Sequence, residues 1–181
     1  GRFFIFGLST GAFLALAFAA RPDLHPPGGV AGCVTVACVD DIPSSVTLDF
    51  SPEQIQTARE TGVCIAPFFP FGGQDNPQQW ELSSSYLDSY AAFPAMQQLA
   101  QSLCVPVLLI HGQDDRHVPV EHAHKLEIVL REHARSDVTT AVIPKANHFF
   151  SSNSGLNKAL AALTAFIQAR SASAERSEGS T

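Results

Sequence analysis

Serine, aspartate and histidine are the residue types that cooperate in nucleophilic catalysis, and one of each stands in a distinctive motif of this chain: Ser9, Asp115 and His148. A serine hydroxyl becomes a good nucleophile only when a base removes its proton, and imidazole suits that task near neutral pH. A carboxylate that hydrogen-bonds the imidazole orients the ring and stabilises the imidazolium that forms. These residue types therefore predict attack by a serine on an electrophilic centre, provided that the fold brings the three side chains together.

The motif around the serine reads Gly7-Leu8-Ser9-Thr10-Gly11. An apolar, β-favouring run (residues 2–6) precedes it and a helix-forming run (residues 12–16) follows it. Strand, glycine-flanked serine and helix in that order are typical of a nucleophile elbow, a sharp turn that lifts the serine hydroxyl above a sheet. The two glycines are expected to relieve strain in the turn and to let strand and helix pass closely.

Two other interpretations compete for this stretch, because residues 3–20 carry no charge. A transmembrane helix is one. A secretory signal is the other, since Arg2 precedes the apolar run and Ala17-Phe18-Ala19 imitates a cleavage site. Four small or polar residues interrupt the run near its middle, which favours a buried strand followed by a buried helix.

Strands and helices are predicted to alternate along the chain. Apolar runs typical of buried strands cover residues 2–6, 30–39, 105–110 and 138–143, and helices are expected at 9–20, 119–133 and 155–170. This order predicts the α/β class, a mainly parallel sheet with helices on both faces. Sites in such sheets form beyond the carboxyl ends of the strands. Ser9, Asp115 and His148 each follow a predicted strand, so we expect them to converge there.

The segment 41–102 differs in character from its flanks, because prolines break it into short pieces and aromatic residues crowd it. Short helices are expected at 52–61 and 94–103. We interpret 41–102 as an insertion between two core strands rather than an independent domain. The core then comprises 1–40 and 103–170, and the polar, small-residue tail 171–181 is expected to be disordered.

Several candidate residues have competing interpretations. Asp114 is an alternative acid, although the spacing to Val118-Pro119 favours Asp115, and Asp114 would then face solvent or cap the loop. His148 has the alternative of being an ordinary loop histidine, and His111 is expected to help shape the acid loop. A metal cluster of His117, His122 and His124 is disfavoured, because alternate positions on a helix point to different faces.

Composition and charge exclude some partners. The chain has 181 residues, 45 % hydrophobic and 15 % charged, with a net charge of −6, which fits one domain with a real core. The negative charge argues against nucleic acid or an anionic membrane surface as the main partner. The cysteines at 33, 38, 64 and 104 fit neither a metal pair nor a disulfide framework. Buried free thiols are expected, which mildly favours a reducing compartment such as the cytoplasm; the oligomeric state stays open.

Taken together, the motifs resemble the C-terminal portion of an α/β-hydrolase, in the branch that holds serine esterases, lipases and aminopeptidase-like enzymes. The run at 7–11 matches the elbow, the run His111-Gly112-Gln113-Asp114-Asp115-Arg116-His117-Val118-Pro119 matches an H-G-x-x-D-x-x-V-P acid loop, and Ala146-Asn147-His148-Phe149 matches the loop of the base. The order serine, aspartate, histidine is also that of this fold. The resemblance covers residues 2–40 and 103–170, and it matches the insertion only as a lid-type element.

The resemblance implies a role for each site residue. Ser9 would be the nucleophile, Asp115 the acid and His148 the base, and the backbone N–H of Thr10 would bind the oxyanion. A small-molecule ester with an apolar or aromatic group would bind at Leu8, Phe68, Phe69, Trp80 and Phe149. The aromatic residues of the insertion have an alternative role as its own small core. Neither a cofactor nor a metal is implied, because the triad supplies both nucleophile and base.

The sequence departs from the family pattern at three places. Lys145 stands where many relatives have glycine before the base loop, and Ala12 where a further glycine is frequent. The early strands and the loop with the second oxyanion donor would lie before Gly1, so the strand at 2–6 would be an exposed edge. Two hypotheses follow: a serine hydrolase of carboxylic esters, with thioester or amide cleavage as the nearest variants, or a non-catalytic remnant without a complete oxyanion hole.

Overall fold

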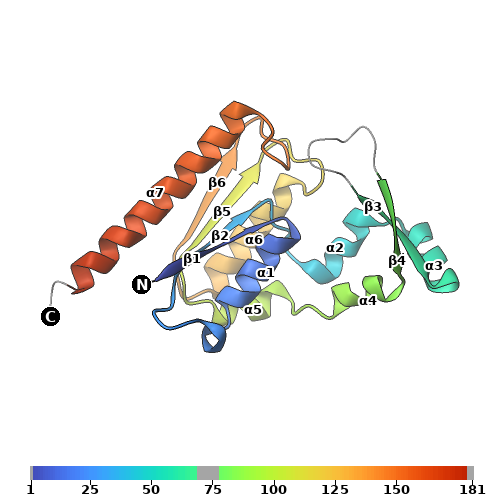
Figure 1. Cartoon of the computed structure of the whole chain (residues 1–181), viewed down its shortest axis with the longest axis horizontal. Helices are drawn as coiled ribbons and strands as arrows, with labels where there is room; N and C mark the ends of the chain where they lie inside the picture. The colour runs from blue at the N-terminus through green and yellow to red at the C-terminus, as the bar shows by residue number, and fades with distance from the viewer. Residues whose placement is uncertain (1, 69–77, 179–181) are drawn as a thin grey trace. The chain divides into compact units, whose positions relative to one another are not determined.

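The computed structural model describes residues 2–68 and 78–178 (Figure 1). The elements in chain order are β1 (Phe3–Leu8), α1 (Thr10–Ala19), the 3-10 helix η1 (Pro22–Leu24), β2 (Val30–Val36), α2 (Ile42–Asp49), α3 (Pro52–Thr61), β3 (Val63–Phe68), β4 (Gln78–Ser83), α4 (Ser85–Ala91), α5 (Met96–Ser102), β5 (Val107–Gly112), α6 (Val120–His133), β6 (Val138–Ile143) and α7 (Asn153–Glu178). The chain divides into two compact units, Gly1–Asp40 with Met96–Thr181, and Asp41–Ala95. Helix α5 thus lies in the larger unit, whereas the sequence was interpreted with the insertion continuing to residue 102.

The larger unit contains a four-stranded sheet in the order β1-β2-β5-β6, and every pair of neighbours is parallel. Its strands lie at the four apolar runs that the sequence indicated, so the α/β class is confirmed. Helix α7 packs on β2, β5 and β6, whereas α1 packs on β1 and β2, and α6 on β5 and β6. All six residues of β5 are buried, as expected for a central strand covered on both faces.

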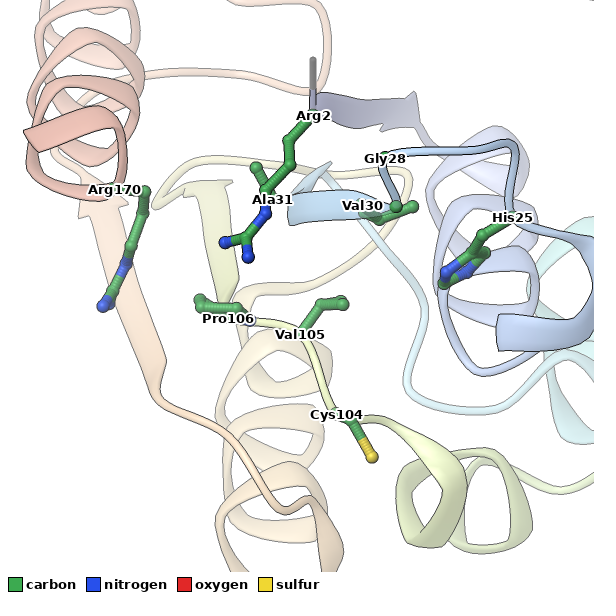
Figure 2. A pocket seen from close by; sticks show the side chains of 10 residues that line it. Arg2, His25, Gly28, Val30, Ala31, Cys104, Val105, Pro106 and Arg170 are labelled. Carbon is green, nitrogen blue, oxygen red and sulfur yellow. The ribbon is translucent and has the colours of Figure 1, made fainter. Parts of the chain in front are cut away.

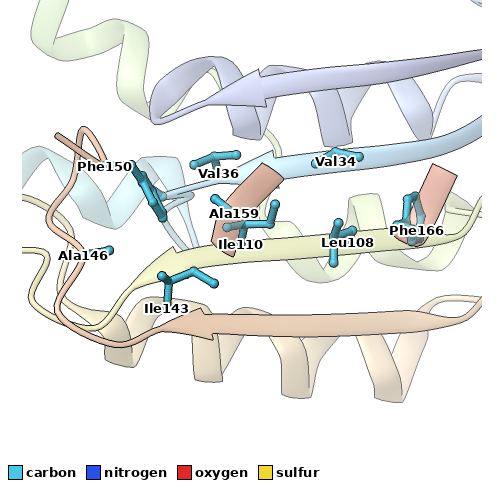
Figure 3. Packing of buried hydrophobic residues seen from close by; sticks show 10 residues of the cluster. Val34, Val36, Leu108, Ile110, Ile143, Ala146, Phe150, Ala159 and Phe166 are labelled. Atoms are coloured by element: carbon cyan, nitrogen blue, oxygen red, sulfur yellow. The ribbon is translucent and has the colours of Figure 1, made fainter. Parts of the chain in front are cut away.

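Alternate residues of the strands face two different cores. One set, which includes Val34, Leu108 and Ile110, packs against Ala159 and Phe166 of α7 (Figure 3). The other set, which includes Cys33, Val107 and Leu109, is also buried and points to the opposite face. Phe13, Leu16, Leu126 and Leu130, from α1 and α6, are almost fully buried as well. Helices therefore cover both faces of the sheet.

Strand β1 forms one edge of this sheet in the part of the chain that the structure describes. Phe6 is 58 % exposed, and Leu8 and Leu14 are also exposed. Helix α1 has only 10 residues, and no helix within 2–68 and 78–178 is long and apolar enough to cross a membrane.

The smaller unit has its own packing. Strands β3 and β4 form an antiparallel pair, α3 packs on β3, and α2 packs on α4. Phe50, Tyr86 and Tyr90 make mutual edge-to-face contacts with centroids 5.6–6.5 Å apart. This is the small aromatic core that the sequence left as an alternative to a lid.

Four elements of this unit, namely α2, β3, β4 and α4, were not predicted from the sequence. Pro67 lies inside β3 and pairs with Gln79. A two-stranded sheet has free edges on both sides, where a proline without an N–H is tolerated. The prolines were interpreted as breaks between elements, and in β3 that interpretation was wrong.

Helix α7 continues to Glu178, whereas the sequence predicted that this helix would end at residue 170. The expectation of a disordered tail from 171 was therefore wrong for residues 171–178. Alanine, glutamate and arginine make up five of the eight residues 171–178, the other three are serine, and the first glycine of the tail is at 179. These residues favour helix strongly enough for α7 to continue past its packed part.

Candidate active site

Ser9 lies on the turn between β1 and α1 in a conformation that residues with a side chain rarely adopt, with φ 55° and ψ −127°. Its N–H donates to the carbonyl oxygen of Val36 at 2.8 Å, and its own carbonyl accepts from the N–H of Ala12 at 2.9 Å. Such strain is held by the surrounding structure and clusters at functional sites. The serine thus has the strand-turn-helix setting of a nucleophile elbow.

The two glycines of this motif have different roles. A Cβ on Gly7 would lie 2.1 Å from the carbonyl oxygen of Gly11, so only glycine fits there. A Cβ on Gly11 would meet nothing within 4 Å of it. We expected both positions to require glycine because strand and helix pass closely. This is confirmed for Gly7, but it is wrong for Gly11, whose Cβ would meet no described atom.

Asp115 lies on the loop between β5 and α6, and its carboxylate is fully buried. Its Oδ1 accepts the backbone N–H groups of His117 and Val118, each at 2.9 Å. Its Oδ2 lies 2.7 Å from Nδ1 of His148. Asp114 instead is exposed, and its N–H donates to the carbonyl oxygen of Ala146. Asp115, and not Asp114, therefore contacts the histidine.

His148 follows β6 on a loop that is hydrogen-bonded to the acid loop. The Nδ1–H of His148 donates to Asp115, so Nε2 is the nitrogen that would accept a proton from a hydroxyl. A Cβ on Gly112 would lie 2.4 Å from the carbonyl oxygen of Ala146, which shows backbone contact between the end of β5 and the base loop. Lys145, the residue at which the resemblance led us to expect glycine in many relatives, has a left-handed φ of 60°.

His111 supports the acid loop from β5. Its Nε2–H donates to the carbonyl oxygen of Val118 at 2.8 Å, and the same nitrogen lies 3.5 Å from Oδ2 of Asp115. Burial lowers the pKa of His111 below its ordinary value, although Val118 and Asp115 oppose that effect. Burial by itself would raise the pKa of Asp115, but the hydrogen bonds from His148, Val118 and His117 outweigh it and lower that pKa. The site therefore pairs a neutral His111 with an ionised Asp115.

These two shifts predict that the free energy of unfolding falls with acid. The lowered pKa of His111 means that the unfolded chain binds protons more readily than the native one, so stability declines as pH drops below about 6.5. The lowered pKa of Asp115 acts in the same direction at lower pH. Each group contributes at most about 1.4 kcal/mol per pH unit.

Urea unfolding at pH 7.5, 6.5 and 5.5 measures this slope. His111→Gln keeps an N–H donor for Val118 but does not titrate, so its slope over this range should be shallower than that of the wild type. An equal slope in both proteins would contradict the assignment.

The three candidate residues share one edge of the sheet. Ser9 follows β1, Asp115 follows β5 and His148 follows β6, and all the strands are parallel, so their carboxyl ends lie together. Strand β2 links them: Val36 accepts from Ser9, and Ala37 donates to Ile110 at 2.9 Å. Asp115 and His148 are in direct contact, and Ser9 stands at the same edge.

The other expected contacts fall into two groups. Thr10 is the first residue of α1, where N–H groups have no acceptor within the helix. Leu8 is 38 % exposed beside Ser9, and the Phe149 ring stands edge-on to His148 with centroids 5.0 Å apart. Phe68, Phe69 and Trp80, expected to bind substrate, have side chains that lie outside the described residues.

Two histidine contacts were missed in the sequence. His122, expected on a solvated helix start, pairs through Nδ1 with the carboxylate of Asp40. His117 places its ring 5.1 Å from that of His148. Neither has a sequence signal, since each partner lies on a different element. Within 2–68 and 78–178, no group of three or more histidine, cysteine or acidic side chains could hold a metal.

The structure also describes four cysteines, and a cavity in the larger unit. All four thiols are free; Cys33, Cys38 and Cys64 are buried, whereas Cys104 is exposed, contrary to expectation. Burial raises the pKa of Cys33 to about 12. A cavity of about 510 Å³ is lined by residues that precede or begin the strands, such as Arg2, Val30 and Pro106 (Figure 2). It therefore lies at the amino ends of the strands, away from Ser9 and His148.

Comparison with solved structures defines the class of the fold, which is that of the α/β-hydrolases. An esterase domain from Rhodothermus marinus aligns with a TM-score of 0.61 at 21 % identity, over 92 % of this chain and 60 % of its own. The esterase Est1E from Butyrivibrio proteoclasticus aligns with 0.65 at 17 % identity, over 95 % and 62 %. A monoacylglycerol lipase from Paleococcus ferrophilus aligns with 0.61 at 17 % identity, over 91 % and 68 %.

The chain spans about 60 % of the length of the two esterases, so it holds part of the fold. A model of the prolyl oligopeptidase family matches residues 1–173. The chain belongs to that family of hydrolases. No curated protein matches it.

Proposed function

We propose that this chain carries the catalytic triad of a serine hydrolase, with Ser9 as nucleophile, His148 as general base and Asp115 as the acid that orients the base. The observation that carries the proposal is the buried hydrogen bond of 2.7 Å between His148 and Asp115, at the same sheet edge as a strained serine. Family membership supports the reaction class.

Each residue has a defined part in the reaction. His148 removes the proton from Ser9 through Nε2 as the serine oxygen attacks the carbonyl carbon, and the resulting imidazolium is stabilised by ionised Asp115. The N–H of Thr10, at the positive end of α1, stabilises the oxyanion of the tetrahedral intermediate. His148 then protonates the leaving group, and water attacks the acyl-enzyme by the same route.

The proposed substrate is a carboxylic ester with an apolar or aromatic group. Exposed Leu8 and the ring of Phe149 flank Ser9 and His148 in the sequence and would contact that group. The esterase from Butyrivibrio proteoclasticus has also been solved with ferulic acid, an aromatic carboxylic acid. Phenyl and feruloyl esters are therefore the first probes, and an aminoacyl anilide tests amide cleavage, which the family name suggests.

Labelling with a fluorophosphonate tests the nucleophile without requiring turnover. We expect the purified chain to be labelled at Ser9, as mapped by peptide mass spectrometry, and Ser9→Ala to abolish the label. Ser89→Ala is the matched control, because Ser89 is exposed and its hydroxyl donates to the carbonyl oxygen of Tyr86.

The alternative function is that of a non-catalytic remnant. A chain that is folded by circular dichroism yet takes no label, while a known serine esterase in the same tube does, would favour the remnant and overturn the proposal.

A further inference from the structure

Three aromatic rings meet around the proposed base. The ring of His117 lies 5.1 Å from that of His148 at 57°, and the ring of Phe149 lies 5.0 Å from His148 at 90°. His117 and Phe149 also contact each other, at 5.6 Å and 65°. Tilted and edge-to-face arrangements at these separations are favourable for aromatic rings. His148 thus has two neighbouring aromatic rings, which also contact each other, in addition to its bond to Asp115.

The two rings differ in where they are attached. Phe149 is the next residue after His148 and belongs to the same loop, so it moves with the base. His117 comes from the loop between β5 and α6, and its backbone N–H is already fixed by the carboxylate of Asp115 at 2.9 Å. His117 therefore contacts both partners of the pair, the acid through its amide and the base through its ring.

We propose that His117 is a positioning residue for His148: its ring holds the imidazole of the base in the orientation that aims Nε2 at Ser9. The inference rests on the proposed function of His148 as general base. It assigns no chemical step to His117, which acts through the base.

A single hydrogen bond does not fix the orientation of an imidazole. The bond from Nδ1 to Asp115 anchors one corner of the ring, and the ring can still tilt about that corner. Catalytic groups must stay within about 10–20° of the productive geometry. A misplacement of about 1 Å costs on the order of 10²-fold in rate. A ring packed against the imidazole from the opposing loop restricts that tilt, which the amide of the same residue cannot do.

The proposal makes the aromatic ring of His117 the feature to be tested. Phenylalanine in place of His117 keeps a planar ring for His148 and Phe149, whereas alanine removes it. A residue that merely fills space would change the stability of the fold without changing the orientation of the base. A positioning role predicts that loss of the ring changes kcat and the NMR signal of the Asp115–His148 hydrogen bond. A space-filling role predicts that neither changes.

The first experiment compares His117→Ala, His117→Phe and the wild type at pH 8, by fluorophosphonate labelling and by hydrolysis of a phenyl ester. We expect His117→Ala to lower the labelling rate and kcat about 10- to 100-fold with KM changed less than about threefold. We expect His117→Phe to restore both to within about threefold. His124→Ala is the matched control, since His124 is an exposed histidine on α6, and it should equal the wild type.

The second experiment reads the base without any activity. In proton NMR the Nδ1–H of His148, bonded to a buried carboxylate, should give a low-field signal that Asp115→Asn removes. We expect His117→Phe to retain this signal and His117→Ala to broaden it through faster exchange. If His117→Ala does not fold, His117→Gln replaces it, because glutamine has similar length without an aromatic ring.

The outcomes separate this inference from the proposed function. Wild-type labelling at Ser9 with an unchanged rate and an unchanged low-field signal in His117→Ala would overturn the inference alone. Failure of His117→Phe to restore either readout would also overturn it. No labelling of Ser9 together with a low-field signal that depends on the ring at 117 would overturn the proposed function, while the contact that orders His148 would stand.

Discussion

Asparagine in place of Asp115 is expected to lower kcat for ester hydrolysis about 10³- to 10⁴-fold, with a small effect on KM. The carboxylate now accepts the Nδ1–H of His148 at 2.7 Å, which leaves Nε2 to take the serine proton. An asparagine can satisfy the amides of His117 and Val118 with its oxygen, and it then turns an NH2 group toward His148. The imidazole must accept at Nδ1 and carry its proton on Nε2, the wrong tautomer for a general base.

Asp114→Asn is the matched control for this prediction. Asp114 is the neighbouring residue, its carboxylate is exposed, and its contact with the base loop runs through its backbone N–H, which asparagine keeps. We expect wild-type kcat from Asp114→Asn, and melting temperatures within a few degrees for both variants at pH 7.5. An equal loss of kcat in the two variants would show that the loop as a whole, rather than the carboxylate at 115, supports the reaction.

Alanine in place of Gly7 is expected to destabilise the fold by at least about 3 kcal/mol, or to prevent folding. The added Cβ would lie 2.1 Å from the carbonyl oxygen and 2.5 Å from the carbonyl carbon of Gly11. Both atoms belong to the backbone at the start of α1, and Gly7 itself is buried in β1. No side chain can move aside, so strand and helix would have to separate.

Gly11→Ala, at the other glycine of the motif, is expected to leave the stability unchanged or to raise it. Its Cβ would have no neighbour within 4 Å, and the residue lies in the first turn of α1, where alanine favours helix by up to about 1 kcal/mol over glycine. Urea unfolding should show Gly7→Ala strongly destabilised and Gly11→Ala equal to or more stable than the wild type. Similar losses in both would mean that close approach at Gly7 is not what requires glycine there.

The expected loss of stability in Gly7→Ala and the strained conformation of Ser9 both result from the tight turn between β1 and α1. Gly7, Ser9 and Gly11 lie within five residues, and the turn between β1 and α1 is tight enough to bring the backbone of Gly7 against that of Gly11. The same tightness places Ser9 at φ 55°. The packing of the sheet and of α1 stabilises this strained backbone, and Ser9 therefore stays at the carboxyl edge of the sheet.

The sequence by itself determined the features that depend on neighbouring residues. Apolar runs predicted the strands of the larger unit, because a strand buried on both faces needs apolar residues at most positions, as residues 107–110 of β5 show. The elbow around Ser9 could also be predicted, since a strand, a glycine-flanked turn and a helix are written in consecutive residues. Placement of Asp115 and His148 after strands followed from the same patterns.

The tertiary structure alone decided what depends on contacts between distant residues. The spacing to Val118-Pro119 already favoured Asp115 over Asp114, but the hydrogen bond of Asp115 to a histidine 33 positions later comes from the fold. The ring of His117 likewise reaches His148 across two loops. Gly7 and Gly11 look alike in the motif, yet only Gly7 faces another backbone. Secondary-structure propensity and hydrophobic periodicity depend on a few neighbouring residues, so they predict which helix, strand or loop carries each candidate site residue. The packing of parallel strands and their loops then selects which side chains touch.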